Sequence, residues 1–103
     1  MPHLIIESSL PLSSKIAEEL HKVVSQQETV SAGSVKTRLY PSLISFSGDQ
    51  PGTEHTAITL KLLPGRSTKL KEKISTNLFS TAKTLIEEGS VSVEIVDLEF
   101  YKK

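Results

Sequence analysis

The stretch MPHLIIE at residues 1–7 predicts a β-strand that begins at the N-terminus. Residues 3–7 form a short apolar run rich in β-branched side chains, which is typical of a buried strand. Pro2 directly precedes this run. Once Met1 is removed, the chain starts with the secondary amine of proline, a group that is both a base and a nucleophile and that no other common residue supplies. The alternative interpretation is that Pro2 simply follows the initiator Met1.

The next segments predict a helix and a second strand. Ser13 or Ser14 can cap a helix over residues 14–28, because a serine hydroxyl accepts a bond from an unpaired backbone N–H. The apolar residues of this helix recur on one stripe: Ile16, Ala17, Leu20, Val23 and Val24. Residues 35–46 predict a long strand in which Pro41 marks an edge, a bulge or a bend. Its apolar positions are Val35, Thr37 and Leu39, and they alternate with Lys36, Arg38 and Tyr40.

The second half of the chain repeats this order after a strong turn signal, GDQPG, at residues 48–52. Residues 55–63 predict a strand, and Ser67 or Thr68 can cap a helix over 70–86. This helix has a wide apolar stripe: Leu70, Ile74, Leu78, Phe79, Ala82, Leu85 and Ile86. Gly89 suits a left-handed turn. Residues 91–100 predict the last strand, and a change of apolar parity between Ile95 and Val96 predicts either a bulge or burial on both faces.

These segments predict one α+β domain over residues 1–103, built from two β-α-β halves at about 1–48 and 53–103. Right-handed crossovers place both helices on one face of a four-stranded sheet with the order β-α-β-β-α-β. No third helix is predicted that would cover the other face. We therefore expect a homo-oligomer.

Composition narrows the class of protein. Lys and Arg total 12, as do Asp and Glu, so a zero net charge gives no reason to expect nucleic-acid binding. The absence of cysteine excludes disulfides and thiolate chemistry. The N-terminus lacks the pattern of a signal peptide, and the longest apolar runs fall far short of the roughly 20 residues that span a bilayer. We therefore expect a cytoplasmic protein that is not inserted in a membrane.

Cationic residues in both halves are the candidate binding groups. Lys36 and Arg38 share one face of the second strand, and Arg66 precedes the second helix, whose N-terminus adds a field that favours anions. This combination suits a carboxylate site. The alternative is that all three cations are solvated surface residues.

Other motifs predict little chemistry. The three histidines, His3, His21 and His55, lack the spacing of metal ligands, although His55 begins a strand and can line a pocket. The serines form no nucleophile elbow, and no glycine-rich phosphate loop is present.

Three segments together resemble a known family: MPHLIIE at 1–7, AGSVKTR at 32–38 and TLKLLPGRS at 59–67. With them the chain resembles the 5-carboxymethyl-2-hydroxymuconate isomerases of the tautomerase superfamily. The resemblance implies a homotrimer with the β-α-β-β-α-β tautomerase-like fold, a role in the catabolism of aromatic compounds, and no cofactor or metal.

The same resemblance implies an active site. Pro2 would be the general base that converts an unsaturated 2-hydroxy dicarboxylate into its 2-oxo form, by moving the hydroxyl proton to a carbon of the same conjugated system. An α-amino group titrates not far above pH 7, so a modest lowering of its pKa leaves the amine unprotonated and able to act as a base. Arg38 and Arg66 would be the other catalytic groups. Lys36, Tyr40 and His55 would contact the substrate. Lys36 departs from the family, which more often has Arg there, and His55 and Pro41 stand at positions where the family has aromatic residues.

Three other functions remain compatible with the sequence. The first is a tautomerase acting on another enol, such as phenylpyruvate. The second is a non-catalytic trimer of the same fold that binds a ligand. The third is a monomeric ferredoxin-like RNA-binding domain, which shares the order β-α-β-β-α-β. The third is disfavoured by the missing paired aromatics and by the zero net charge.

Overall fold

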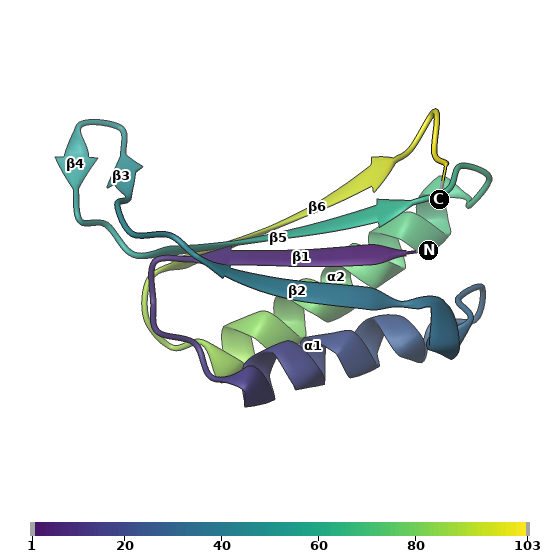
Figure 1. Cartoon of the computed structure of the whole chain (residues 1–103), viewed down its shortest axis with the longest axis horizontal. Coiled ribbons are helices and arrows are strands. Elements are labelled where there is room, and N and C mark those ends of the chain that lie inside the picture. The colour runs from purple at the N-terminus through teal and green to yellow at the C-terminus, as the bar shows by residue number, and fades with distance from the viewer. Residues whose placement is uncertain (1, 103) are drawn as a thin grey trace.

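The computed structural model describes residues 2–102, with only the backbone described at Ser47 and Pro51. The predicted order β-α-β-β-α-β is confirmed, with a short 3₁₀ helix and a small hairpin added to it (Figure 1). The elements in chain order are β1 (His3–Ser8), α1 (Ser14–Ser25), η1 (Ala32–Ser34), β2 (Lys36–Pro41), β3 (Phe46–Ser47), β4 (Gln50–Pro51), β5 (His55–Leu62), α2 (Thr68–Leu85) and β6 (Ser90–Asp97).

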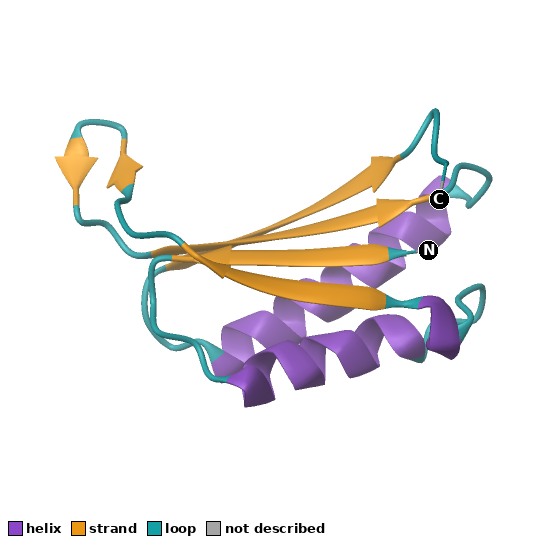
Figure 2. Cartoon of the chain, in the orientation of Figure 1, coloured by secondary structure: helices purple, strands orange, loops and turns teal. Residues whose placement is uncertain are grey.

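The main sheet has the strand order β2-β1-β5-β6. Strand β1 pairs in parallel with β2 and antiparallel with β5, and β5 pairs in parallel with β6. Both helices pack against the same face of this sheet, as the right-handed crossovers predict (Figure 2). The two strands of each β-α-β half are direct neighbours, which differs from the split arrangement of ferredoxin-like domains.

The core lies between this face of the sheet and the two helices. Leu4 and Ile6 of β1 alternate with residues on the other face, and both are fully buried. The other buried members of the core cluster are Leu20, Val24, Val35, Ile58, Leu60, Leu62, Ile74, Leu78, Ala82 and Ile86. Beside this cluster, the hydroxyl groups of Ser8 and Thr56 satisfy each other at 2.7 Å, so neither is left buried without a partner.

The helices follow their predicted stripes with two corrections. Ser67 caps α2 by accepting a bond from the backbone N–H of Leu70 at 3.1 Å, whereas Ser13 caps α1 without a side-chain bond. Helix α1 ends at Ser25, three residues earlier than predicted. The apolar stripe of α2 is also narrower than predicted, because Phe79 is 43% exposed and Leu85 36% exposed.

The prediction of one strand over residues 35–46 is wrong. Strand β2 ends at Pro41, and the N–H of Ser42 still donates to the carbonyl of Ser8 in β1 at 2.8 Å before the chain leaves the sheet. Because β2 is an edge strand, the missing N–H of Pro41 removes no bond to β1, and the predicted edge position is confirmed. The predicted turn at 48–52 is confirmed as the end of the β3–β4 hairpin, with Gly48 and Gly52 at positive φ. This hairpin projects beyond the sheet (Figure 1).

The last strand shows which of the two expectations for residues 95–96 is correct. Strand β6 keeps a continuous register with β5 through Leu60–Ile95 and Lys61–Val96, so the bulge is wrong. Ile95 packs against the core, while Val96 lies on the opposite face and is partly buried. Apolar side chains on both faces therefore explain the change of parity. The strand also ends at Asp97, three residues before the predicted end.

Gly89 sets the start of β6, and its replacement tests this turn. Its φ is 77°, and a Cβ there would lie 2.5 Å from the carbonyl oxygen of Glu54, which accepts the next N–H, from Ser90. We expect Gly89→Ala to lower the free energy of unfolding by about 2–4 kcal/mol, measured by urea denaturation.

Two other glycines provide matched controls for this prediction. Gly52 has a positive φ but open space around it, so Gly52→Ala is expected to cost only about 1–2 kcal/mol. Gly33 has neither constraint, so Gly33→Ala is expected to change stability by less than about 0.5 kcal/mol. Equal stabilities for the three variants would contradict the role of Gly89.

Candidate functional site

Strand polarity brings four chain segments to one end of the sheet. Because β1 and β2 are parallel and β5 is antiparallel to them, the starts of β1 and β2 lie beside the end of β5. The register places His3 opposite both Lys36 and Lys61. The end of β6 joins this group, since the N–H of Leu98 donates to Leu62 at 2.7 Å. We call this region the Pro2 end of the sheet.

Pro2 is fully buried at this end. Its carbonyl accepts a hydrogen bond from the backbone N–H of Lys36 at 3.0 Å, which ties the start of β1 to the start of β2. The position of the Pro2 ring is therefore set by backbone pairing and packing. Met1 lies outside the described residues.

Lys36, Arg38 and Lys61 share the face of the sheet that the helices leave uncovered, here called the open face. Lys36 is exposed and Arg38 is half-buried. The Nη1 of Arg38 donates to Nδ1 of His3 at 3.0 Å. Arg38 therefore faces the histidine, two positions along β2 from the residue that pairs with Pro2.

His3 is surrounded by these cations. Since arginine can only donate, Nδ1 of His3 is the acceptor, and the proton of the neutral ring lies on Nε2. Nε2 is 3.1 Å from the hydroxyl oxygen of Tyr101, which accepts that proton. Burial, followed by the charges of Arg38, Lys36 and Lys61, lowers the pKa of His3 below its ordinary value of 6.5.

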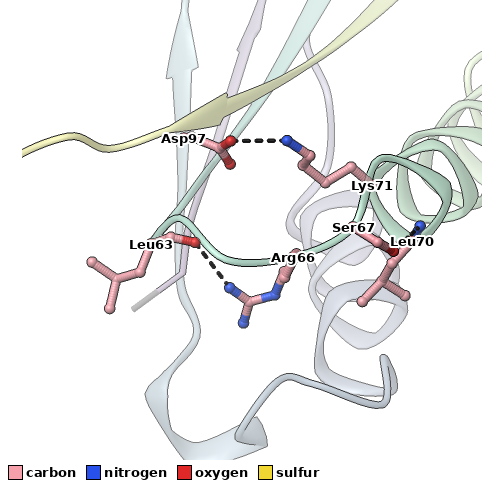
Figure 3. Close-up of polar contacts among 6 residues, drawn as sticks. All are labelled: Leu63, Arg66, Ser67, Leu70, Lys71 and Asp97. Atoms are coloured by element: carbon pink, nitrogen blue, oxygen red, sulfur yellow. Dashed lines mark hydrogen bonds and ion pairs between the residues drawn. The ribbon is translucent and has the colours of Figure 1, made fainter.

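Arg66 lies in the turn between β5 and α2, at the same end of the sheet. Gly65 before it adopts φ 121°, and Ser67 after it caps α2 (Figure 3). The guanidinium donates from Nη1 to the Leu63 carbonyl at 3.2 Å, and from Nε and Nη2 to the hydroxyl and the carbonyl of Thr29 at 2.9 Å each. The turn thus joins the loop that follows α1.

Tyr40 and His55 lie at the opposite end of the sheet. Tyr40 pairs in register with Glu7, near the end of β1, and His55 begins β5. The ring nitrogens of His55 contact the hydroxyl groups of Ser90 and Ser92. Within one chain, the structure therefore brings Pro2, Lys36 and Arg66 to one end and does not bring Tyr40 or His55 there.

The contacts that sequence patterns did not reveal are those of His3 and Thr29. The alternation of β1 was a usable signal for His3, because it places His3 on the same face as Ile5 and opposite to Leu4. Its contact with Tyr101 and the contact of Thr29 with Arg66 connect residues 98 and 37 positions apart. No periodicity within a strand or a helix signals such pairs.

The described residues contain neither a metal cluster nor a membrane span. Over residues 2–102, no three His, Cys, Asp or Glu side chains gather in an arrangement that could hold a metal ion. No helix in this range has both the length and the apolar character needed to cross a bilayer.

Comparison with solved structures shows the class of fold. No protein-family model matches the chain, and no curated protein matches its sequence. The chain is similar to a 5-carboxymethyl-2-hydroxymuconate isomerase from Deinococcus radiodurans R1, with a TM-score of 0.83 over 99% of this chain and 88% of that chain, at 22% identity.

Two further structures show the same similarity. A macrophage migration inhibitory factor-like protein from Entamoeba histolytica superimposes with a TM-score of 0.75 over 99% of this chain and 95% of that one, at 18% identity. A structure described as "W0 fused 4-OT wild type symmetric trimer" has a TM-score of 0.81 over 93% and 86% of the two chains, at 20% identity. The chain therefore has a tautomerase-like fold, and the resemblance to the 5-carboxymethyl-2-hydroxymuconate isomerases is confirmed at the level of the fold.

The lowered pKa of His3 predicts a pH dependence of stability. Because the pKa of His3 is lower in the folded chain than in the unfolded chain, the unfolded chain binds the proton more readily below about pH 6.5. The free energy of unfolding therefore falls as the pH falls below this value. We expect His3→Asn to reduce this slope between pH 7 and 5, measured as the urea midpoint at several pH values. Tyr101→Phe, which keeps the titrating ring, is the control and should retain the slope. A slope unchanged in His3→Asn would contradict the prediction.

Proposed function

We propose that the chain is a cofactor-independent tautomerase of the cytoplasm, acting on an unsaturated 2-hydroxy or 2-oxo dicarboxylate similar to 5-carboxymethyl-2-hydroxymuconate. The observation that carries the proposal is the burial of Pro2 at the end of the sheet to which Lys36 and Arg66 also belong. The tautomerase-like fold supports it, because the similar structures include two 5-carboxymethyl-2-hydroxymuconate isomerases.

The proposed base is the nitrogen of Pro2 after removal of Met1. Burial disfavours the protonated form of an amine, which favours a neutral base near pH 7. This amine would accept the proton of the 2-hydroxyl group. The electron pair of the O–H bond forms the 2-oxo group, the conjugated double bonds shift, and the same proton returns to a carbon at the other end of the conjugated system.

The cations of the Pro2 end would bind the substrate and stabilise the dienolate. Arg66 suits a carboxylate, because a guanidinium binds it with two parallel N–H bonds. Lys36, which is exposed and whose backbone N–H is bonded to Pro2, adds a point charge beside it. Arg38 would contribute charge from the neighbouring position, where it also holds the ring of His3.

The positions of Tyr40 and His55 favour a site shared between copies of the chain. They lie at the opposite end of the sheet from Pro2, so their proposed contact with substrate requires a second copy. No helix or strand of the described chain covers the open face, although Tyr101 of the C-terminal segment contacts His3 there. This face is the surface on which copies would meet (Figure 2). The segment that leads from β2 to the β3–β4 hairpin adds apolar side chains for such contacts, with Leu43 94% exposed and Ile44 79% exposed. We infer a homotrimer.

The role of Pro2 is tested with two forms of the protein that differ only at the N-terminus. Protein that begins at Pro2, verified by mass spectrometry, is expected to ketonise 2-hydroxymuconate. The reaction is measured as the loss of dienol absorbance. A form that retains Met1 has a tertiary amide in place of the amine, so kcat is expected to fall by about 10²–10⁴-fold.

Phenylpyruvate enol serves as the comparison substrate. It carries one carboxylate, so a site built for dicarboxylates should give it the lower kcat/KM. Equal activity of the two N-terminal forms would contradict the role of Pro2 as the base. A higher kcat/KM for phenylpyruvate would favour a tautomerase of aryl enols instead.

The homotrimer is tested by sedimentation. The expected particle has about three times the 11.3 kDa mass of one chain. Ile5 lies in the middle of the open face and is only partly exposed, so Ile5→Lys adds a fourth cation beside Arg38 and should give monomers. Glu72→Lys, on the exposed side of α2, should leave the trimer intact. A monomeric wild-type protein would contradict the shared site.

A further inference from the structure

Thr29 binds one edge of the Arg66 side chain. Its hydroxyl oxygen accepts from Nε and its carbonyl oxygen accepts from Nη2, both at 2.9 Å. Thr29 lies in the loop between α1 and η1, whereas Arg66 lies in the turn between β5 and α2. One residue therefore accepts two parallel N–H bonds from the guanidinium, as a carboxylate does in a bidentate pair.

Two of the five N–H groups of the Arg66 guanidinium have no acceptor among the described residues. A guanidinium has five N–H groups, one on Nε and two on each terminal nitrogen. The chain uses one from each nitrogen, since Nη1 donates to the Leu63 carbonyl. Nη1 and Nη2 therefore each keep one N–H without a partner among the described residues. Two neighbouring nitrogens with one donor each match the two oxygens of a carboxylate.

All three acceptors are neutral, so they orient Arg66 without cancelling its charge. Two oxygens belong to Thr29 and one to Leu63. The ion pairs of the described chain involve other cations, and the nearby Lys71 is paired with Asp97 at 2.8 Å (Figure 3). Arg66 is also only partly exposed. Its full charge thus remains available to an anion.

We propose that Thr29 is a positioning residue that orients Arg66 to bind a substrate carboxylate through Nη1 and Nη2. The inference rests on the proposed function, because it assumes a dicarboxylate ligand at the Pro2 end. Orientation by Thr29 lowers the conformational entropy that Arg66 loses on binding, since the flexible side chain is already ordered. Thr29 itself would not touch the substrate.

The test uses adipate, a saturated six-carbon dicarboxylate that cannot tautomerise. Thr29→Val keeps the size of the side chain and the backbone carbonyl but removes the hydroxyl acceptor of Nε. We expect the Kd for adipate to rise about tenfold in Thr29→Val and to stay within about twofold in Thr29→Ser, which keeps a hydroxyl. The titration is followed by NMR of the Arg66 Nε–H signal, whose hydrogen exchange should accelerate in Thr29→Val only.

A double-mutant cycle separates positioning from a general structural effect. In the Arg66→Ala background, Thr29→Val should no longer change adipate binding, because its effect acts through Arg66. The thermal midpoints of both Thr29 variants should match the wild type, since Thr29 is exposed. With 2-hydroxymuconate as substrate, Thr29→Val should raise KM and leave kcat within about twofold.

The outcomes distinguish this inference from the proposed function. An unchanged Kd and an unchanged Nε–H exchange rate in Thr29→Val would overturn the role of Thr29, even in an active enzyme. Wild-type protein that binds no adipate would overturn it as well. If processed wild-type protein binds adipate through the Thr29–Arg66 pair but converts neither 2-hydroxymuconate nor phenylpyruvate, the positioning role stands and the tautomerase proposal fails.

Discussion

Strand β1 lies between β2 and β5, so hydrogen bonds hold both of its edges and the first described residue is fixed at the end of the sheet. A residue at a chain terminus is usually mobile, because few contacts restrain it. Here Pro2 is buried, and its carbonyl is bonded to the start of β2. The same pairing brings the β5–α2 turn to this end. The arrangement of all candidate site residues therefore depends on the central position of β1.

The two faces of the sheet differ in chemical character. The face under the helices buries leucine, isoleucine and valine side chains in one cluster, which supplies the hydrophobic stabilisation of the chain. The open face gathers Lys36, Arg38 and Lys61 around His3. These like charges repel one another. Burial, followed by the same charges, lowers the pKa of His3, so that the ring stays neutral and accepts a hydrogen bond from Arg38. Such a face is suited to an anion or to the acidic groups of another copy.

Two cations near the start of α2 differ in whether a carboxylate compensates their charge. Lys71 forms an ion pair with Asp97, so its charge is largely compensated (Figure 3). Arg66 is held only by neutral oxygens, and its charge is not compensated by any described carboxylate. Neutral acceptors restrict the rotamers of a cation while leaving its field intact. A side chain held in this way is prepared for an anion, whereas a paired side chain would first have to break its ion pair.

The sequence alone determined the order of the elements, a cap of α2 at Ser67 or Thr68, and the alternation of β2. These features follow from neighbours two to four positions apart, which propensity and periodicity describe. Only the tertiary structure decided that β2 stops at Pro41, that Tyr40 and His55 lie away from Pro2, and that His3 and Arg66 meet Tyr101 and Thr29. Such contacts depend on strand register and loop paths. Those are set by packing of the whole chain, because no local pattern encodes which distant residues will meet.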